Sequence, residues 1–229
     1  MAAAVVLLVA SVAGATTITY QTLPGESVGG QPVAARATFV TGADGSVHVT
    51  LTNLQANPTS VIQNLSDLAF GFDTPNTDVG ILTSSSGAER TVAADGSFTD
   101  GATVATGWAV ENFFAGGLRL HVLGTPTAPT HTIIVGPGGG GTYSNANNSI
   151  AGNVPHNPFL HDSAEFDLHV PFVTADSNVV VAIFSFGTEE GPVVPGVPLV
   201  PEPSTGAIFA LGAIVMATLR RRGMTGRRA

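Results

Sequence analysis

The chain has 229 residues and a formal net charge of −8, and only 10% of its residues are charged, against about a quarter in ordinary soluble domains. It contains no lysine and no cysteine, which excludes disulfides and thiolate chemistry. Residues 1–202 hold all 16 acidic residues and only three arginines, so we expect no binding to nucleic acid.

An apolar segment opens the chain. Residues 2–13 are apolar apart from Ser11, a length that is typical of a signal-peptide core and too short to span a bilayer. Ala13 and Ala15 on either side of Gly14 supply the small residues that signal peptidase needs, although no basic residue precedes the apolar run. We predict a cleavable signal peptide over residues 1–15; the alternative is a buried N-terminal helix or strand.

The body, residues 16–190, shows short β patterns and no helical period with caps. Asp44-Gly45 predicts a hairpin turn between strands at 36–41 and 46–52. Further strands are expected at 16–22, 62–72, 107–110, 118–123, 132–135 and 164–170, and an apolar central strand at 179–186. We predict an all-β fold, a two-sheet β-sandwich of jelly-roll or immunoglobulin-like type.

Three histidines near the end of the body are candidates for zinc. Neutral imidazole is a good zinc ligand, and three ligands suffice for an open site. However, His156 and His161 lie in a segment rich in Pro and Asn without fixed ligand spacing, and His169 is expected on the polar face of a strand. We favour solvent-facing or locally hydrogen-bonded histidines over a zinc site.

Three oxygen-bearing residues, Asp73, Asn76 and Asp78, are candidates for calcium. Calcium takes six to eight oxygen ligands, and this spacing lacks the acid that completes an EF-hand loop. Turns in which Asp and Asn bond their own backbone explain the same residues. We therefore predict no metal and no other cofactor.

The body carries no strong catalytic motif, since neither G-x-S-x-G nor H-E-x-x-H occurs. Residues 136–141 match G-x-G-x-x-G, but a loop composition follows where a phosphate site needs a helix. Trp108 could stack on a sugar, although we favour a place in the core. A glycosidase pair of carboxylates is defined by spatial separation, so the sequence leaves a hydrolase open.

The C-terminal part begins with residues 191–199, which are rich in Pro and Gly and predict a linker without strand pairing. A stiff motif at 200–204 follows, because each Pro fixes its own φ. Residues 205–219 contain no charge and predict a single transmembrane helix, and a basic tail at 220–229 is expected to stay cytoplasmic. The motif is Val200-Pro201-Glu202-Pro203-Ser204, and the tail opens with the basic stop Arg220-Arg221-Arg222.

This tripartite end resembles the PEP-CTERM sorting signal of bacteria. The resemblance implies recognition by exosortase, a multi-pass membrane enzyme, with the tail held in the inner membrane until it is cut near Pro201-Glu202-Pro203. The body would then pass to the cell surface or to an extracellular polysaccharide matrix. Residues 51–60, 67–72 and 153–161 of the body loosely resemble exported domains that are commonly joined to such tails. This resemblance implies no activity.

These observations lead to one functional prediction with two alternatives. We predict an exported, non-enzymatic bacterial surface or extracellular-matrix protein that meets signal peptidase and exosortase and associates with exopolysaccharide. A surface-attached glycan hydrolase is the first alternative. A calcium-stabilised carbohydrate-binding module is the second.

Overall fold

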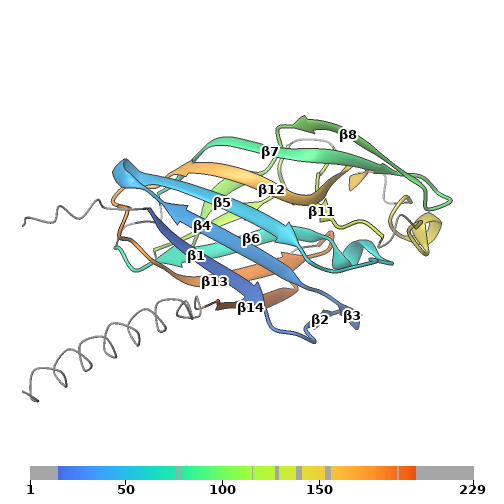
Figure 1. Cartoon of the computed structure of the whole chain (residues 1–229), viewed down its shortest axis with the longest axis horizontal. Coiled ribbons are helices and arrows are strands. Elements are labelled where there is room, and N and C mark those ends of the chain that lie inside the picture. The colour runs from blue at the N-terminus through green and yellow to red at the C-terminus, as the bar shows by residue number, and fades with distance from the viewer. Residues whose placement is uncertain are drawn as a thin grey trace, which may run out of the picture. The chain divides into compact units, whose positions relative to one another are not determined.

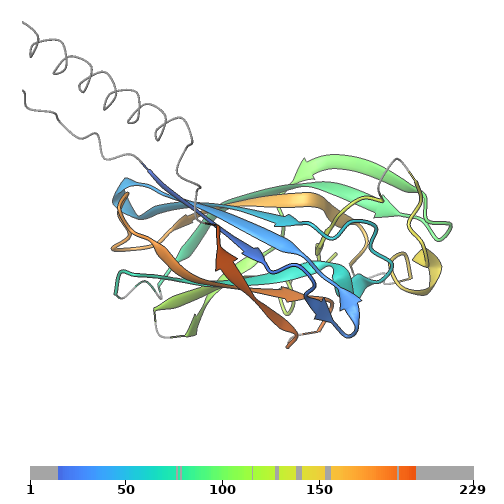
Figure 2. The same cartoon turned by 60° about the horizontal axis from the view of Figure 1, so that its bottom comes forward.

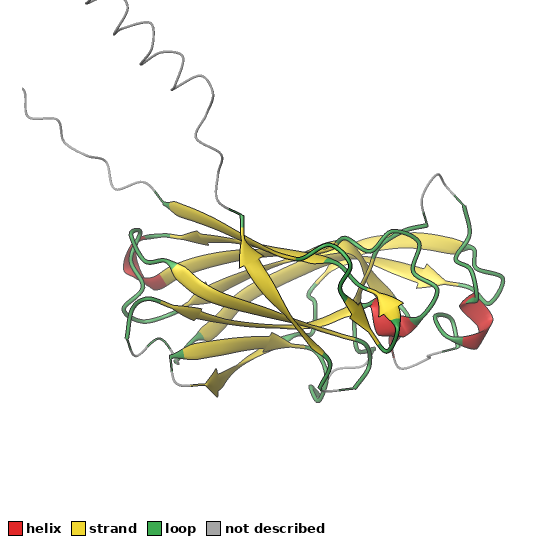
Figure 3. Cartoon of the chain, turned by 90° about the horizontal axis from the view of Figure 1, so that it is seen from below, coloured by secondary structure: helices red, strands yellow, loops and turns green. Residues whose placement is uncertain are grey.

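Short runs with alternating polarity form strands along most of the chain in the computed structural model (Figure 3). The model describes residues 15–75, 77, 79–114, 116–126, 129–137, 141–152, 156–189 and 191–199. The strands are β1 Thr16–Thr22, β2 Ser27–Val28, β3 Gln31–Pro32, β4 Ala35–Thr41, β5 Ser46–Asn53, β6 Leu65–Phe72, β7 Ile81–Val92, β8 Phe98–Val104, β9 Ala109–Phe114, β10 Gly117–His121, β11 Ile133–Ile134, β12 Phe159–His169, β13 Val179–Phe186 and β14 Val193–Pro198. Single 3-10 turns occupy Ala43–Gly45, Val61–Gln63 and Ala146–Asn148.

The β4–β5 hairpin turns where the sequence indicates. Asp44 and Gly45 both have positive φ, at 59° and 79°, as a tight hairpin turn requires. A Cβ at Gly45 would lie 2.7 Å from the carbonyl oxygen of Val170, so the position needs glycine for space as well as for φ. In β5, Val47, Val49 and Leu51 are buried, which confirms the predicted alternation.

The main sheet closes on itself into an eight-stranded barrel (Figures 1 and 2). Its hydrogen-bonded order is β12-β5-β4-β1-β14-β13-β6-β11, and β11 returns to β12. The all-β prediction is confirmed, but the predicted two-sheet sandwich of jelly-roll or immunoglobulin-like type does not describe this pairing. A sandwich keeps two separate sheets, whereas here β14 and β11 bridge both gaps.

Two hairpins extend the sheet beyond the ring. β7 and β8 branch from β12, and β10 and β9 branch from β6. The β7–β8 pair lies along one edge of the body in Figure 1. The β10–β9 pair positions the candidate site described below, because it brings charged side chains beside the outer face of β6.

The linker prediction for residues 191–199 is wrong over residues 193–198. These residues form β14, which pairs with β13 on one side and with β1 on the other. Tyr20 of β1 lies opposite Pro198, so the last strand residue pairs with the first strand of the barrel. Pro198 lies at the end of the strand, whereas Pro195 lies within it opposite Ile183 of β13. The chain divides into two units at this point, residues 1–198 and 199–229.

The barrel interior is filled by apolar side chains. Its largest fully buried members include Phe39, Phe70, Phe166, Phe184 and Leu51. Phe39 and Phe70 pack with ring centroids 5.2 Å apart, which joins opposite walls of the barrel. β13 is a central strand as predicted, but its outer face is only partly covered, since Val180 is 56% exposed whereas Ser185 is buried. The interior is thus a packed core, and functional groups must be sought on the outer surface.

Candidate functional site

One charged side chain is buried on the outer face of β6. All eight residues of β6 are buried, and Leu68 and Phe70 point into the apolar core. Asp67 has the opposite orientation because side chains alternate along a strand. It is 5% exposed and lies in register between Ser185 of β13 and His121 of β10. A carboxylate in such a place is costly unless it has a partner.

Arg119 of β10 is that partner. Its Nε donates a hydrogen bond to Asp67 Oδ2, and its Nη1 donates to Glu111 Oε1 at 3.1 Å. The guanidinium carbon also lies 5.2 Å from the centroid of the Phe113 ring. One largely buried arginine therefore serves two carboxylates and one aromatic ring, all from β6, β9 and β10.

His121 also lies beside this cluster. Its Nδ1 lies 2.8 Å from the carbonyl oxygen of Leu123, and its Nε2 lies 3.7 Å from Glu111 Oε2. Because a carbonyl oxygen only accepts, Nδ1 carries a proton, and Nε2 faces the carboxylate. His121 thus limits the positions that Glu111 can take.

A cavity of about 290 Å³ opens over this cluster. We call it the Asp67 pocket. Its lining residues come from β6, the β9–β10 hairpin, β13 and the start of β14, and they are Asp67, Phe113, Arg119, Leu123, Ser185, Glu189, Gly191 and Val193. Apolar walls with a few convergent polar groups are typical of small-ligand sites.

The pKa of Asp67 is unusually high. Burial raises the pKa of its carboxyl to about 6, although the nearby charge and hydrogen bond of Arg119 lower it. The cost of removing the carboxylate from water therefore exceeds what the arginine returns. An ionisable group that lowers the stability of the folded state and lies in a cavity is a candidate for a functional role.

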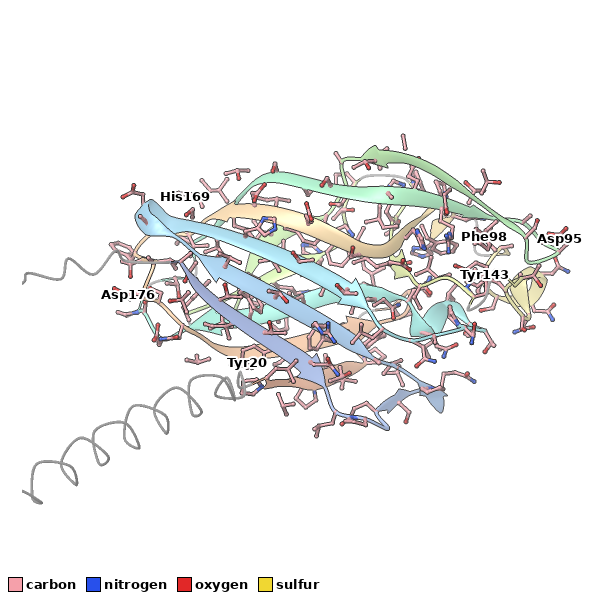
Figure 4. The ribbon with its side chains drawn as sticks, in the orientation of Figure 1. Tyr20, Asp95, Phe98, Tyr143, His169 and Asp176 are labelled. Carbon is pink, nitrogen blue, oxygen red and sulfur yellow. The ribbon has the colours of Figure 1, made fainter. Side chains whose placement is uncertain are left out.

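A second arginine cluster lies between β7, β8 and the loop at 141–145. Arg90 is 3% exposed, and its Nε and Nη2 donate to the two carboxylate oxygens of Asp100 at 2.6 and 2.9 Å. Its Nη1 donates to Tyr143 Oη, and its guanidinium carbon lies 3.9 Å from the Phe98 ring centroid. Figure 4 shows Phe98 and Tyr143 close together. These contacts join the hairpin to the loop, so the cluster has a structural role.

The zinc candidates are not brought together. His161 lies beside Asp162 and within 4.0 Å of Asp100, whereas His169 is at the other end of β12, far from Tyr143 in Figure 4. His156 is buried with Nδ1 3.0 Å from the carbonyl oxygen of Thr130. In the part of the chain that the structure describes, no three His, Asp or Glu side chains are grouped to hold a metal ion.

The calcium candidates are only partly described. Asp73 accepts hydrogen bonds from the backbone and side-chain nitrogens of Asn178, at 2.9 and 3.0 Å, and these bonds lower its pKa. Asn76 and Asp78 lie outside the described residues. Asp73 thus ties the end of β6 to the start of β13.

Trp108 is a core residue, as the sequence analysis favoured. It is buried, its Nε1 donates to the carbonyl oxygen of His131 at 2.9 Å, and its ring packs 5.2 Å from that of Phe166. It is therefore not placed to stack on a ligand. In the loop with the G-x-G-x-x-G pattern, residues 138–140 lie outside the described part of the chain.

The processing segments also lie largely outside it. Ala15 is described and directly precedes β1, but Ala13 is not. The sorting motif at 200–204, the apolar segment at 205–219 and the stop at Arg220, Arg221 and Arg222 are likewise not described. Within the described ranges there is no helix with the length and hydropathy that crossing a bilayer requires.

The Asp67 pocket was not anticipated from the sequence. The available signal was that Asp67 is the only charged residue in the apolar run 65–72. Its partner is 52 positions away, so the sequence alone could not pair them.

The comparisons with known proteins identify the C-terminal segment. Residues 199–222 match the PEP-CTERM protein-sorting motif. The chain therefore carries this motif, which implies exosortase-dependent sorting to the cell surface. No curated protein and no solved structure matches the chain.

Proposed function

We propose that this chain is an exported, non-enzymatic surface or extracellular-matrix protein whose barrel associates with exopolysaccharide after exosortase has processed the tail. The observation that carries the proposal is the sorting motif at 199–222, which begins one residue after β14 ends at Pro198. A protein with such a tail is sorted as cargo, so the barrel is the part that acts at the destination.

Both predicted cleavages spare the barrel. Removal of residues 1–15 leaves β1 whole, since β1 begins at Thr16, whose backbone and side chain both bond the carbonyl oxygen of Ala175. A cut near Pro201–Pro203 leaves β14 whole. Every strand of the closed ring therefore survives processing, which supports a folded and stable mature product.

The outer surface suits a hydrated, uncharged partner. The exposed side chains of β7 and β8 are mainly short and hydroxyl-bearing, as at Thr83, Ser84, Thr99 and Thr103. Hydroxyl groups both donate and accept hydrogen bonds, as sugar hydroxyls do. This composition supports contact with polysaccharide better than contact with a charged polymer.

The sorting part of the proposal is tested in a bacterium that contains exosortase. We expect Glu202→Ala or Pro203→Ala to leave uncut protein in the membrane fraction, whereas the matched barrel variant Glu26→Ala is processed normally. Intact mass of the protein from membrane and surface fractions reports both cleavages. An unchanged mature mass in the Glu202 and Pro203 variants contradicts the proposed role of the motif.

A glycan hydrolase is the second candidate, and one observation favours it. Asp67 has a raised pKa and shares Arg119 with a second carboxylate, Glu111. Glycoside cleavage commonly uses two carboxyl groups, one of which has a raised pKa and acts as the acid. Turnover of chromogenic glycosides by the mature protein that is lost in Asp67→Asn supports the enzyme; retention on purified exopolysaccharide without turnover supports the binding protein.

A further inference from the structure

We propose that the Asp67 pocket binds one hexopyranose unit that carries no acidic group, that is, a neutral sugar or an amino sugar. The inference rests on the proposed association with polysaccharide and names the unit that would be recognised. Three properties of the pocket support it: its size, its walls and its charge.

The size of the pocket suits a single ring. Pockets for larger, drug-sized ligands span roughly 300–1,000 Å³, and this one measures about 290 Å³. It is walled on one side by the β9–β10 hairpin and on the other by the start of β14. A single unit of a chain can enter while its neighbours remain in solvent.

The walls offer an apolar surface that remains exposed. Phe113 is 48% exposed and Val193 is 57% exposed, and both line the pocket with the buried Leu123. Exposed apolar side chains grouped around a cavity are typical of a binding site. The C–H face of a pyranose ring is apolar and can pack against such a wall.

The floor offers fixed polar groups. Asp67, Arg119 and Ser185 stand on three different strands, whose ladders hold their backbones in place. A carboxylate accepts hydrogen bonds at about four sites, and a guanidinium donates up to five. Neighbouring hydroxyls of a sugar need acceptors and donors side by side, and the Asp67–Arg119 pair places a carboxylate beside a guanidinium on the pocket floor.

The charges around the pocket select against acidic sugars. The described charged side chains here are Asp67, Glu111 and Glu189 against Arg119. Arg119 already serves two of these carboxylates. A uronate, phosphate or sulfate would meet excess negative charge, whereas an ammonium group would meet Glu189 at the rim.

The test measures sugar binding by the full chain, purified in a detergent without a sugar headgroup. The probes are methyl glucoside, glucosamine and glucuronate, and saturation-transfer NMR measures their binding. Binding to purified exopolysaccharide is measured alongside. We expect the first two sugars to bind and glucuronate to bind at least tenfold more weakly. Phe113→Ala should weaken binding at least tenfold, whereas Phe172→Ala, which removes an exposed Phe elsewhere, should not.

A second variant covers the case in which Phe113→Ala disturbs the hairpin. Glu189→Gln is at the rim, and we expect it to reduce the preference for glucosamine over methyl glucoside with little change for the neutral sugar. Binding of glucuronate as tight as that of glucoside overturns the proposal.

The two proposals fail in different ways. If exopolysaccharide binds equally to the wild type and to Phe113→Ala, the pocket is not the site, while the surface function stands. If exopolysaccharide is not bound by the wild type either, the association proposed for the barrel fails together with the pocket.

Discussion

In the described part of the chain, Arg119 and Arg90 both have largely buried side chains, and each binds an aspartate. The pKa values of the two aspartates are nevertheless shifted in opposite directions. In the Arg119–Asp67 pair both side chains are largely buried: that of Asp67 is 6% exposed and that of Arg119 is 11% exposed. At Arg90 only the base is buried, and the side chain of Asp100 is 48% exposed. Burial raises the pKa of Asp67, whereas the hydrogen bonds of Arg90 hold the pKa of Asp100 below its usual value.

The difference shows what water does for an ion pair. Asp100 keeps part of its hydration while it bonds Arg90, so the pair stabilises the charged acid. Asp67 loses almost all its hydration, and one shared arginine does not replace it. The Arg90–Asp100 pair is a structural contact. The Arg119–Asp67 pair lowers the stability of the folded state and lies in a pocket. Three substitutions test this distinction.

Arg119→Ala should have the largest effect. It leaves Asp67 buried without its partner, and we expect a loss of about 3–5 kcal/mol in the free energy of unfolding at pH 7. The loss should shrink at pH 5, because the folded state then holds Asp67 protonated and uncharged. Urea unfolding at both pH values measures it.

Two arginine variants are the controls for this result. Arg90→Ala also removes buried contacts, but its cost should be the same at pH 5 and pH 7, since Asp100 can be hydrated. Arg36→Ala removes an exposed arginine bonded to Gln21 and should change stability by less than about 0.5 kcal/mol. A pH-independent loss in Arg119→Ala contradicts the account of Asp67.

Asp67→Asn should stabilise the barrel at neutral pH. The folded-state pKa of about 6 lies above the ordinary value of 3.8, so the folded state binds this proton more tightly than the unfolded state. The free energy of unfolding of the wild type therefore falls as pH rises from 4 to 6. The variant lacks this slope and gains up to about 3 kcal/mol at pH 7.

Urea titrations at pH 4, 5, 6 and 7 compare the two proteins. Loss of stability at pH 7 in Asp67→Asn would mean that Arg119 compensates the burial of Asp67 in full. The two ion pairs would then be equivalent.

Asp100→Asn should have the smallest effect and the opposite sign. It weakens the hydrogen bonds of Arg90, and we expect a loss of about 1 kcal/mol at pH 7, since solvent screens a half-exposed acid. The lowered pKa of Asp100 stabilises the folded state above the ordinary value of 3.8, and this contribution disappears as pH falls through the folded pKa. Thermal unfolding at pH 7 and pH 3 should show a smaller loss at pH 3 than at pH 7.

Much of the strand content could be predicted, because alternation is a local property of the chain. The expected strands at 16–22 and 179–186 coincide with β1 and β13, and the strand at 46–52 differs from β5 by one residue. β7 and β8 were missed, since their exposed Ser, Thr and Gly residues give no clear alternation. Local patterns thus reveal a strand where its two faces differ in polarity, as in β5, or where a short apolar run marks a central strand, as in β13.

The end of the barrel was mispredicted for a different reason. Pro and Gly in residues 191–199 normally favour a linker. Here Pro195 and Pro198 lie within β14, and the strand closes the barrel because β1 and β13 both offer edges to it. Composition describes what a segment prefers alone, whereas the available partners decide whether it pairs.

The sequence by itself determined the all-β class, the β4–β5 turn and the sorting motif, because each depends on residues that are neighbours in the chain. Only the tertiary structure decided that β14 and β11 close a barrel, and that Asp67 lies beside Arg119 over a cavity. Those features depend on which distant strands lie next to each other, and β1 and β14 are separated by nearly the whole body. Burial and charge at a site follow from that neighbourhood, which local patterns do not encode.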